Sequence, residues 1–203
     1  MNGIVPAAHP SDEALAALAA SGDDSAFETI VGRYQARVFR LACRLTSDTD
    51  APDVLQETFL QVHRHLTSFR RESAFATWLY RIATNAALMH RRRSARRPAE
   101  SLDEFMPRFD ERGRHVATPA ELRVASRADE LLDRQLLADR ARDVIARLPD
   151  RYREAFVLRD LEEMSTADVA RVLGVEPATV RQRVHRARLM LRGFLSDLVG
   201  VKP

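Results

Sequence analysis

The stretch that decides the fold reads STADVARVLGVEPATVRQRVHRARLML and covers residues 165–191. It opens at Ser165 with the serine-x-x-acid spacing of a helix N-cap. Gly174 follows a short apolar-periodic segment, where a helix C-cap needs a residue that adopts a positive φ without steric cost. Pro177 then stands in the first turn of a second helix, where its missing N–H does no harm. This order of signals predicts a helix-turn-helix.

The second of these helices combines an apolar stripe with a cationic surface. Its apolar residues recur at helical spacing and are Val180, Val184, Ala187 and Leu191. The positions around them hold Arg181, Arg183, Arg186, Arg188 and Arg192. Because the stripe can pack on a core while the arginines face a major groove, we predict that the chain binds DNA.

Composition limits the class of protein and where its charge can lie. The chain has 203 residues, of which 45% are hydrophobic and 30% charged, as in a folded globular protein. The net charge of +3 excludes a uniformly basic surface, so any nucleic-acid footprint must be local. The single cysteine, Cys43, excludes an internal disulfide and lies in an apolar run that predicts a buried thiol. The sequence has neither a signal-peptide pattern nor a run of about 18 apolar residues, so we expect a cytoplasmic protein without membrane insertion.

Helical periodicity recurs along most of the chain, and no sustained strand-like alternation occurs. Before the arginine-rich stretch at 91–93 we expect helices at about 12–20, at about 25–45, from Asp50 as N-cap, and after Ser73. The last of these should bury Phe75, Leu79, Ile82, Ala86 and Met89. The sequence therefore predicts an all-α fold.

Periodicity fades between these helices and the helix-turn-helix. From Pro98 to about Thr118 prolines and mixed charges predominate, which is typical of a flexible linker. We therefore expect two small helical modules: a domain at residues 1–97, a linker at 98–128 and a helix-turn-helix domain at 129–203.

Two segments together resemble the extracytoplasmic-function (group 4) sigma factors, which belong to the sigma-70 family. DAPDVLQETF at 50–59 and FRRESAFATWLYRIATN at 69–85 are similar to region 2 of that family. LP at 148–149, REAF at 153–156 and TVRQRVHRAR at 179–188 are similar to region 4. The resemblance implies a subunit that directs bacterial RNA polymerase to −35 and −10 promoter elements and helps to open the duplex. It also implies three partners: the polymerase core, through its large-subunit clamp helices and its flap; promoter DNA; and an anti-sigma factor.

Three polar residues of the third helix lie away from its apolar stripe: Asp53, Gln56 and Glu57. Taken alone, exposed acids early in a helix can be a solvated face that the helix dipole favours. The resemblance implies that these residues dock on the clamp helices, where charge complementarity supplies specificity and on-rate.

The loop at 68–72 and the helix after it match the part of the family that reads one strand of the −10 element. An unstacked base needs an aromatic or apolar pocket together with amide or hydroxyl groups. The candidates are Phe69, Ser73, Phe75, Trp78, Tyr80, Arg81 and Asn85. Asn85 is the best candidate for a base-edge hydrogen bond. Trp78 is also a candidate core residue, since a lone tryptophan in a small helical module is usually part of the core. His65 and Met89 match positions at which the base pockets of family members vary, so the sequence does not predict which base is preferred.

An arginine cluster ends the first domain and comprises Arg91, Arg92, Arg93, Arg96 and Arg97. It is either a solvated helix end, which the helix dipole favours, or a clamp on phosphates beside the melted DNA.

In the last helix the resemblance assigns −35 recognition to Thr179, Arg181, Gln182, His185 and Arg186. Arginine can bind guanine and glutamine can bind adenine bidentately, each giving about 1–3 kcal/mol of discrimination. Thr179 suits a phosphate, and Arg183 and Arg188 suit backbone contacts or a solvated position.

Two other classes of function fit the sequence less well. A stand-alone helix-turn-helix transcriptional regulator accounts for the C-terminal half but gives the 69–85 segment no role. An enzyme acting on nucleic acid would need a phosphate loop, a nucleophile–base pair or a metal site, and none is visible. His63 and His65 point to different faces of a helix, so they do not form a metal site. We expect no enzymatic activity, no metal and no cofactor.

Overall fold

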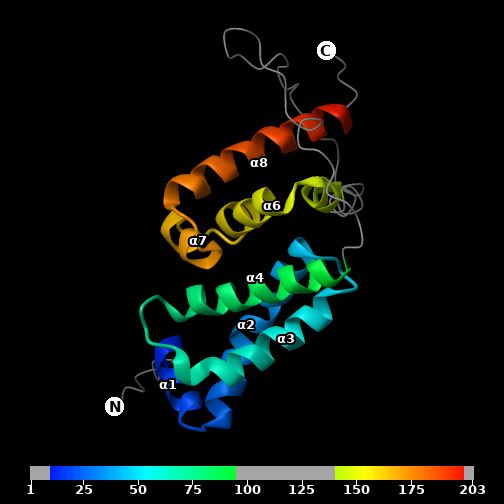
Figure 1. Ribbon diagram of the computed structural model, residues 1–203. Coiled ribbons are helices and arrows are strands. Elements are labelled where there is room, and N and C mark those ends of the chain that lie inside the picture. Colours follow the sequence, from blue (N-terminus) through cyan, green and yellow to red (C-terminus); the bar gives the residue numbers. More distant parts are fainter. Residues whose placement is uncertain (1–9, 95–139, 199–203) are drawn as a thin grey trace, which may run out of the picture. The chain divides into compact units, whose positions relative to one another are not determined.

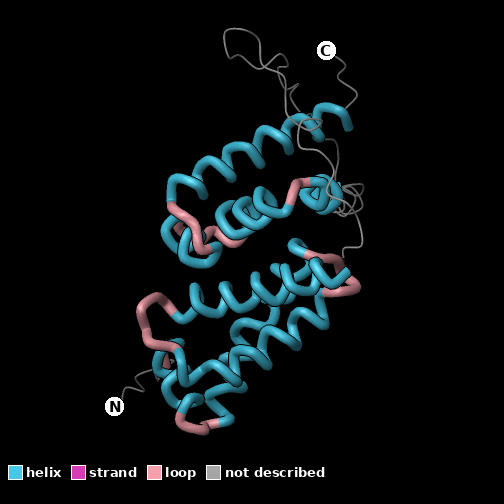
Figure 2. Tube along the Cα trace, in the orientation of Figure 1, coloured by secondary structure: helices cyan, strands magenta, loops and turns pink. Residues whose placement is uncertain are grey.

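The structure is a computed structural model that describes residues 10–94 and 140–198. The chain divides at Ser94 into two units, and the described part of each is built of helices without a strand (Figure 2). These observations confirm the predicted all-α fold. The predicted linker and the predicted start of the second domain lie outside the described residues. Within those residues no helix is long and apolar enough to cross a lipid bilayer.

The first unit is organised around one long central helix, α2, which packs against the other three α-helices of the unit, α1, α3 and α4 (Figure 1). Its buried stripe includes Ile30, Tyr34, Val38, Leu41 and Leu45, all on one helical face. Cys43 lies beside this stripe and is half-buried rather than fully buried. The elements are α1 (Asp12–Ala20), α2 (Asp24–Leu45), α3 (Ala51–His65), the short 3-10 turn η1 (Leu66–Ser68) and α4 (Phe75–Ser94).

The predicted capping role of Asp50 is wrong. Asp50 stands at the N-cap position of α3, but its backbone is already helical, with φ −90° and ψ −19°. A capping side chain normally needs an extended backbone, so the carboxylate makes no cap bond and instead accepts a 2.8 Å hydrogen bond from Ser47 Oγ.

The predicted burial of Met89 is also wrong, because its side chain is 48% exposed. The buried residues of α4 instead include Phe75, Leu79, Ala83 and Ala87, which recur every four residues. Met89 follows Ala87 by two residues, roughly 200° around the helix, and so lies away from this buried face.

The second unit contains the predicted helix-turn-helix. Ser165 Oγ accepts a 3.1 Å hydrogen bond from the Asp168 backbone N–H, and Gly174 ends the first helix with φ 63°. Both predicted caps are therefore confirmed. The elements are a helix at 140–147, α6 (Asp150–Phe156), the π-helical turn η3 (Val157–Leu161), α7 (Thr166–Leu173) and α8 (Pro177–Leu198).

The core of this unit lies between α8 and the helices before the motif. It consists of Val144, Leu148, Tyr152, Ala187, Met190 and Phe194. Arg153 is also buried, with 6% exposure, and closes the end of the helix at 140–147. Its guanidinium donates to the carbonyls of Ile145 (3.0 Å) and Leu148 (2.7 Å), and also to that of Ala146.

Candidate nucleic-acid interface

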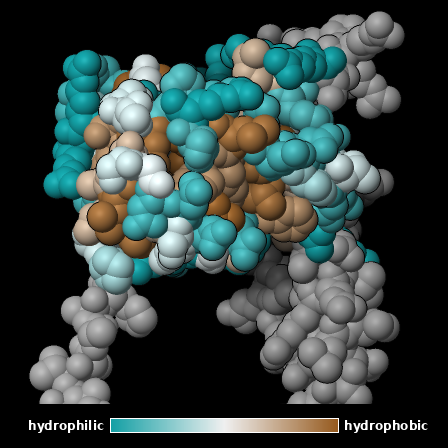
Figure 3. Space-filling model, turned by 90° about the horizontal axis from the view of Figure 1, so that it is seen from below, coloured by the Kyte–Doolittle hydropathy of each residue, from teal (hydrophilic) through white to brown (hydrophobic). Residues whose placement is uncertain are grey.

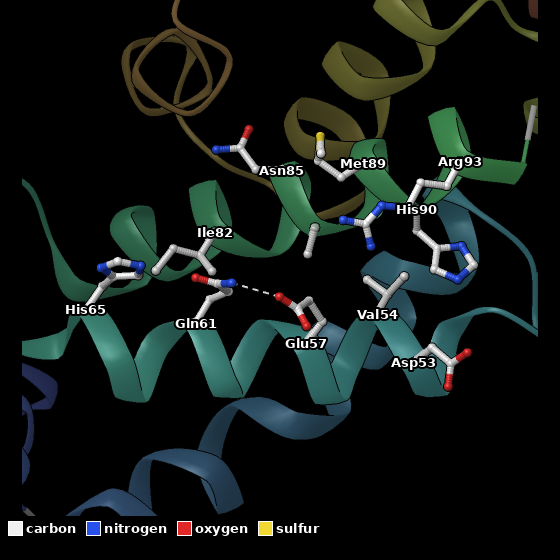
Figure 4. Close-up of a pocket in the computed structure, with 11 residues that line it drawn as sticks. Asp53, Val54, Glu57, Gln61, His65, Ile82, Asn85, Met89, His90 and Arg93 are labelled. Atoms are coloured by element: carbon white, nitrogen blue, oxygen red, sulfur yellow. Dashed lines mark hydrogen bonds between the residues drawn. The ribbon is translucent and has the colours of Figure 1, made fainter.

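A groove separates α3 from α4 in the first unit (Figure 4). Its α3 wall carries a row of polar side chains at four-residue spacing, and its α4 wall carries an amide, a thioether and a guanidinium. The residues that supply these groups are Asp53, Glu57, Gln61 and His65 on α3, and Asn85, Met89 and Arg93 on α4. The groove thus brings together residues that the sequence assigned to different partners.

The acidic residues on the α3 wall of the groove are exposed, and one of them is hydrogen-bonded to another residue of the same wall. Asp53 and Glu57 are both exposed, and Glu57 accepts a 2.7 Å hydrogen bond from Gln61 Nε2. Gln56 is exposed as well but does not line the groove. Sequence reasoning missed Gln61, although its spacing of four from Glu57 was a signal that could have found it.

Aromatic residues gather where the loop before α4 meets the helix. The ring centroids of Phe69 and Phe75 each lie within 6 Å of Trp78, at 5.4 and 5.7 Å. Phe75 is 0% exposed and Tyr80 5% exposed, so neither ring is available to a base in this conformation. Phe69 and Trp78 are only half-buried. Trp78 therefore lies at the edge of the core, in contact with core residues and partly accessible from outside.

The other residues proposed to contact the −10 strand lie at or near the surface. Arg81 and Asn85 are exposed one helical turn apart on α4, whereas Ser73 is half-buried before the helix. Arg92 and Arg93 are exposed at the end of α4, and Arg91 is half-buried. The remaining two arginines of the predicted cluster, at 96 and 97, lie outside the described residues.

The exposed face of α8 carries most of the residues proposed for −35 recognition. Arg181, Gln182 and His185 are exposed, while Thr179 is half-buried beside the turn of the motif. Arg186 is also half-buried, and one of its terminal nitrogens donates to the Tyr152 hydroxyl at 3.4 Å.

Arg188 is exposed, which fits the expected solvated position, but it also has a partner within the fold. It forms a bidentate ion pair with Asp160 of η3, with both N–O distances 2.8 Å. The hydrogen bonds that Arg188 donates to the Asp160 carboxylate raise the pKa of Arg188. Because it joins α8 to η3, Arg188 acts in the fold of the motif.

The two histidines of α3 lie apart, as expected. His63 packs edge-on against Phe27, with ring centroids 5.0 Å apart, whereas His65 lines the groove. The described residues contain no group of three or more potential metal ligands.

Comparison with known families identifies both units. Residues 30–97 match Sigma-70 region 2, and residues 138–191 match Sigma-70, region 4. The ECF RNA polymerase sigma-E factor of Haemophilus influenzae is 37% identical over 194 residues, which cover 93% of this chain and 97% of that protein. The chain belongs to the extracytoplasmic-function sigma factors. The sigma-E factor of Escherichia coli K12 is 35% identical over 193 residues, covering 93% and 96% of the two chains.

Solved structures agree with this assignment of the chain to the sigma factor family. The structure of CnrH in complex with the cytosolic domain of CnrY matches with a TM-score of 0.67 at 27% identity, covering 93% of this chain and 99% of that one. The sigma factor RpoE of Bartonella quintana, solved with the anti-sigma factor NepR, shares the fold with a TM-score of 0.59 at 23% identity, covering 84% and 96%. The predicted resemblance is therefore confirmed, and the family consists of transcription initiation factors rather than catalysts.

Proposed function

We propose that this sigma factor binds core RNA polymerase in the bacterial cytoplasm, directs it to −35 and −10 promoter elements and assists duplex opening, without catalysing a reaction itself. One observation carries the proposal: a region 2 unit and a region 4 unit occur in this order in one chain. A stand-alone regulator would need only the second unit.

For the −35 element, α8 would enter the major groove with its exposed face. Arg181 can donate two parallel hydrogen bonds to guanine, and Gln182 can pair with adenine in the same way. Thr179 would donate to a phosphate and so fix the register of the helix on the duplex.

For the −10 element, the groove and the aromatic cluster supply complementary chemistry. The partly exposed rings of Phe69 and Trp78 can stack against an unpaired base. Asn85 offers both an amide donor and a carbonyl acceptor to a base edge. Phe75 and Tyr80 would support these groups from the core, and the exposed arginines at 92 and 93 would bind phosphates of the opened strand.

For polymerase binding, the exposed acids Asp53 and Glu57, with Gln56 beside them, would contact a basic surface of the large-subunit clamp helices. Asn85 lies across the groove from these acids, so a polymerase subunit and the −10 strand would occupy neighbouring surfaces of one unit.

We also propose that an anti-sigma factor holds the protein inactive. CnrH and the Bartonella quintana RpoE were both solved with a second protein bound, in the latter case a named anti-sigma factor. Apolar side chains reach the surface of this chain (Figure 3), and exposed examples in the first unit are Leu18, Phe39 and Leu60. Purification of the tagged protein from its native cells should recover such a partner. Recovery of polymerase alone would contradict this proposal.

Transcription from a promoter library with purified core polymerase tests the proposed function. Start sites that appear only when the protein is added, and that share −35 and −10 sequences, would support it. The rival regulator would instead bind specific duplex DNA by itself, add no start sites and fail to bind core.

Arg186→Ala is expected to weaken −35-dependent transcription by about tenfold, the value of one bidentate base contact, while core affinity stays unchanged. Tyr152→Phe is the matched control, because it removes only the hydroxyl that accepts from Arg186. The control should transcribe like the wild type. An equal loss in both variants would show that Arg186 acts through its bond to Tyr152 and not at DNA.

The double variant Asp53→Ala with Glu57→Ala is expected to weaken core binding about tenfold in a fluorescence competition assay, because it removes two charges from the proposed contact. Asp24→Ala with Glu28→Ala is the control, since these acids have the same spacing in the first turns of α2 and are also exposed. Equal affinities of the two double variants would contradict the assignment of this surface.

A further inference from the structure

Glu13, in the first turn of α1, contacts both the first residue of α4 and the loop that precedes this helix. Its carboxylate oxygen Oε1 accepts a 3.2 Å hydrogen bond from the backbone N–H of Phe75, the first residue of α4. Its backbone carbonyl accepts a 3.2 Å hydrogen bond from the guanidinium of Arg71 in the middle of the loop. One residue therefore holds both the loop and the start of the helix.

The bond to Phe75 serves the helix in the way an N-cap does. The first N–H groups of a helix have no partner within the helix, and Ala74, which precedes α4, has no side-chain acceptor. The hydroxyl of Ser73 is directed to the carbonyl of Ala74 at 3.4 Å. A carboxylate from a distant helix supplies the acceptor, and its negative charge is favoured at a helix N-terminus.

The bond to Arg71 holds a residue in an uncommon backbone conformation. Arg71 has φ 59°, in the left-handed region that non-glycine residues rarely adopt. Such a conformation persists only where surrounding contacts stabilise it. The ordered loop then keeps Phe69 against Trp78, with ring centroids 5.4 Å apart.

Helix α1 itself is fixed on α2, so Glu13 has a rigid support. The neighbouring Asp12 accepts hydrogen bonds from Arg33 (2.7 Å) and from the Tyr34 hydroxyl (2.5 Å). Burial and the bond to Asp12 raise the pKa of Tyr34, so this hydroxyl stays protonated and remains a donor.

We propose that Glu13 is a positioning residue for −10 recognition: it holds the loop at 69–74 and the N-terminus of α4 in the arrangement that receives the opened DNA strand. This proposal rests on the proposed function, which assigns that loop to the −10 element. Glu13 acts through the loop and α4 and does not itself contact DNA.

The first readout follows loop position without DNA. Trp78 is the only tryptophan of the chain, and Phe69 packs against it. Glu13→Ala removes the carboxylate that accepts from Phe75 N–H but keeps the backbone carbonyl that accepts from Arg71. We expect acrylamide to quench Trp78 fluorescence about twofold more efficiently in this variant, because the start of α4 and the adjoining loop loosen and expose the indole. Quenching equal to that of the wild type would overturn the proposal.

The second readout follows function in the holoenzyme. Glu13→Ala should form about tenfold less open complex, measured by permanganate reactivity of the −10 thymines, while core affinity is unchanged. Removal of a negative charge would by itself strengthen binding to DNA phosphates, so a loss has the opposite sign to a simple electrostatic effect. Unchanged open-complex formation would overturn the proposal.

Two further variants separate the explanations. Glu28→Ala removes an exposed acid from the same unit, whereas Glu13 is half-buried, and it should behave like the wild type in both readouts. Glu13→Gln keeps an oxygen acceptor without the charge, so it should fall between the wild type and Glu13→Ala. If Glu13→Ala loses core binding through misfolding, Glu13→Gln carries the test, and wild-type values for it would refute the proposal. Failure of the wild-type holoenzyme to open any promoter would refute the proposed function and, with it, this role of Glu13.

Discussion

Replacement of Arg153 by methionine is expected to destabilise the second unit by about 3 kcal/mol. The guanidinium is almost fully buried and donates to three backbone carbonyls at the end of the helix at 140–147 and just beyond it. Methionine keeps most of the apolar volume but leaves the three carbonyls, of which that of Leu148 is buried, without their donor. The variant should therefore lose −35-dependent transcription at temperatures where the wild type is active.

Chemical denaturation with two probes measures this effect on the full chain. Trp78 reports the first unit alone, whereas helical circular dichroism follows both units. Arg153→Met should shift the dichroism transition to lower urea and leave the fluorescence transition in place. The control is Arg151→Met, which removes an exposed guanidinium that stacks on Tyr152 at 4.7 Å and should cost less than about 1 kcal/mol. Equal midpoints for the two variants would contradict the assigned role of Arg153.

Phe75→Ala is expected to destabilise the first unit by about 3–5 kcal/mol, because it empties a fully buried aromatic site. The ring packs edge-on against Tyr34 and Phe69, with centroids 5.9 and 5.4 Å apart, and against Trp78. The helical periodicity predicted that this residue is buried, whereas the family resemblance made it a candidate for contact with DNA. The structure indicates that Phe75 affects transcription by packing in the core of the first unit and not by contact with DNA.

Phe75→Leu distinguishes the two roles. If Phe75 acts by packing, leucine should retain most of the stability, at a cost of less than about 1.5 kcal/mol, and also most −10-dependent transcription. If the ring stacks on a base, leucine should remove transcription while the protein stays folded. Urea denaturation followed by Trp78 fluorescence, together with transcription from a −10 promoter, gives both quantities.

Local signals in the sequence determined where a helix begins or ends when that end depends only on neighbouring residues. The caps at Ser165 and Gly174 and the start of α8 at Pro177 were predicted correctly, because each rests on the side chain or the φ preference of one residue. The helix expected at about 25–45 was also found, as α2, because helical periodicity is a property of residues three or four positions apart. The family itself was recognisable from two short motifs in the correct order.

The tertiary structure alone decided which faces are available to partners. Periodicity predicted the burial of Phe75 but also that of Met89, and only the packing of α4 against its neighbouring helices places Met89 at the surface. Contacts between distant residues were hidden for a related reason: Glu13 lies 62 residues before the N–H that it caps, and Asp160 lies 28 residues before Arg188. Periodicity and capping rules describe neighbours within a few residues of each other, whereas these pairs form only when the helices pack together.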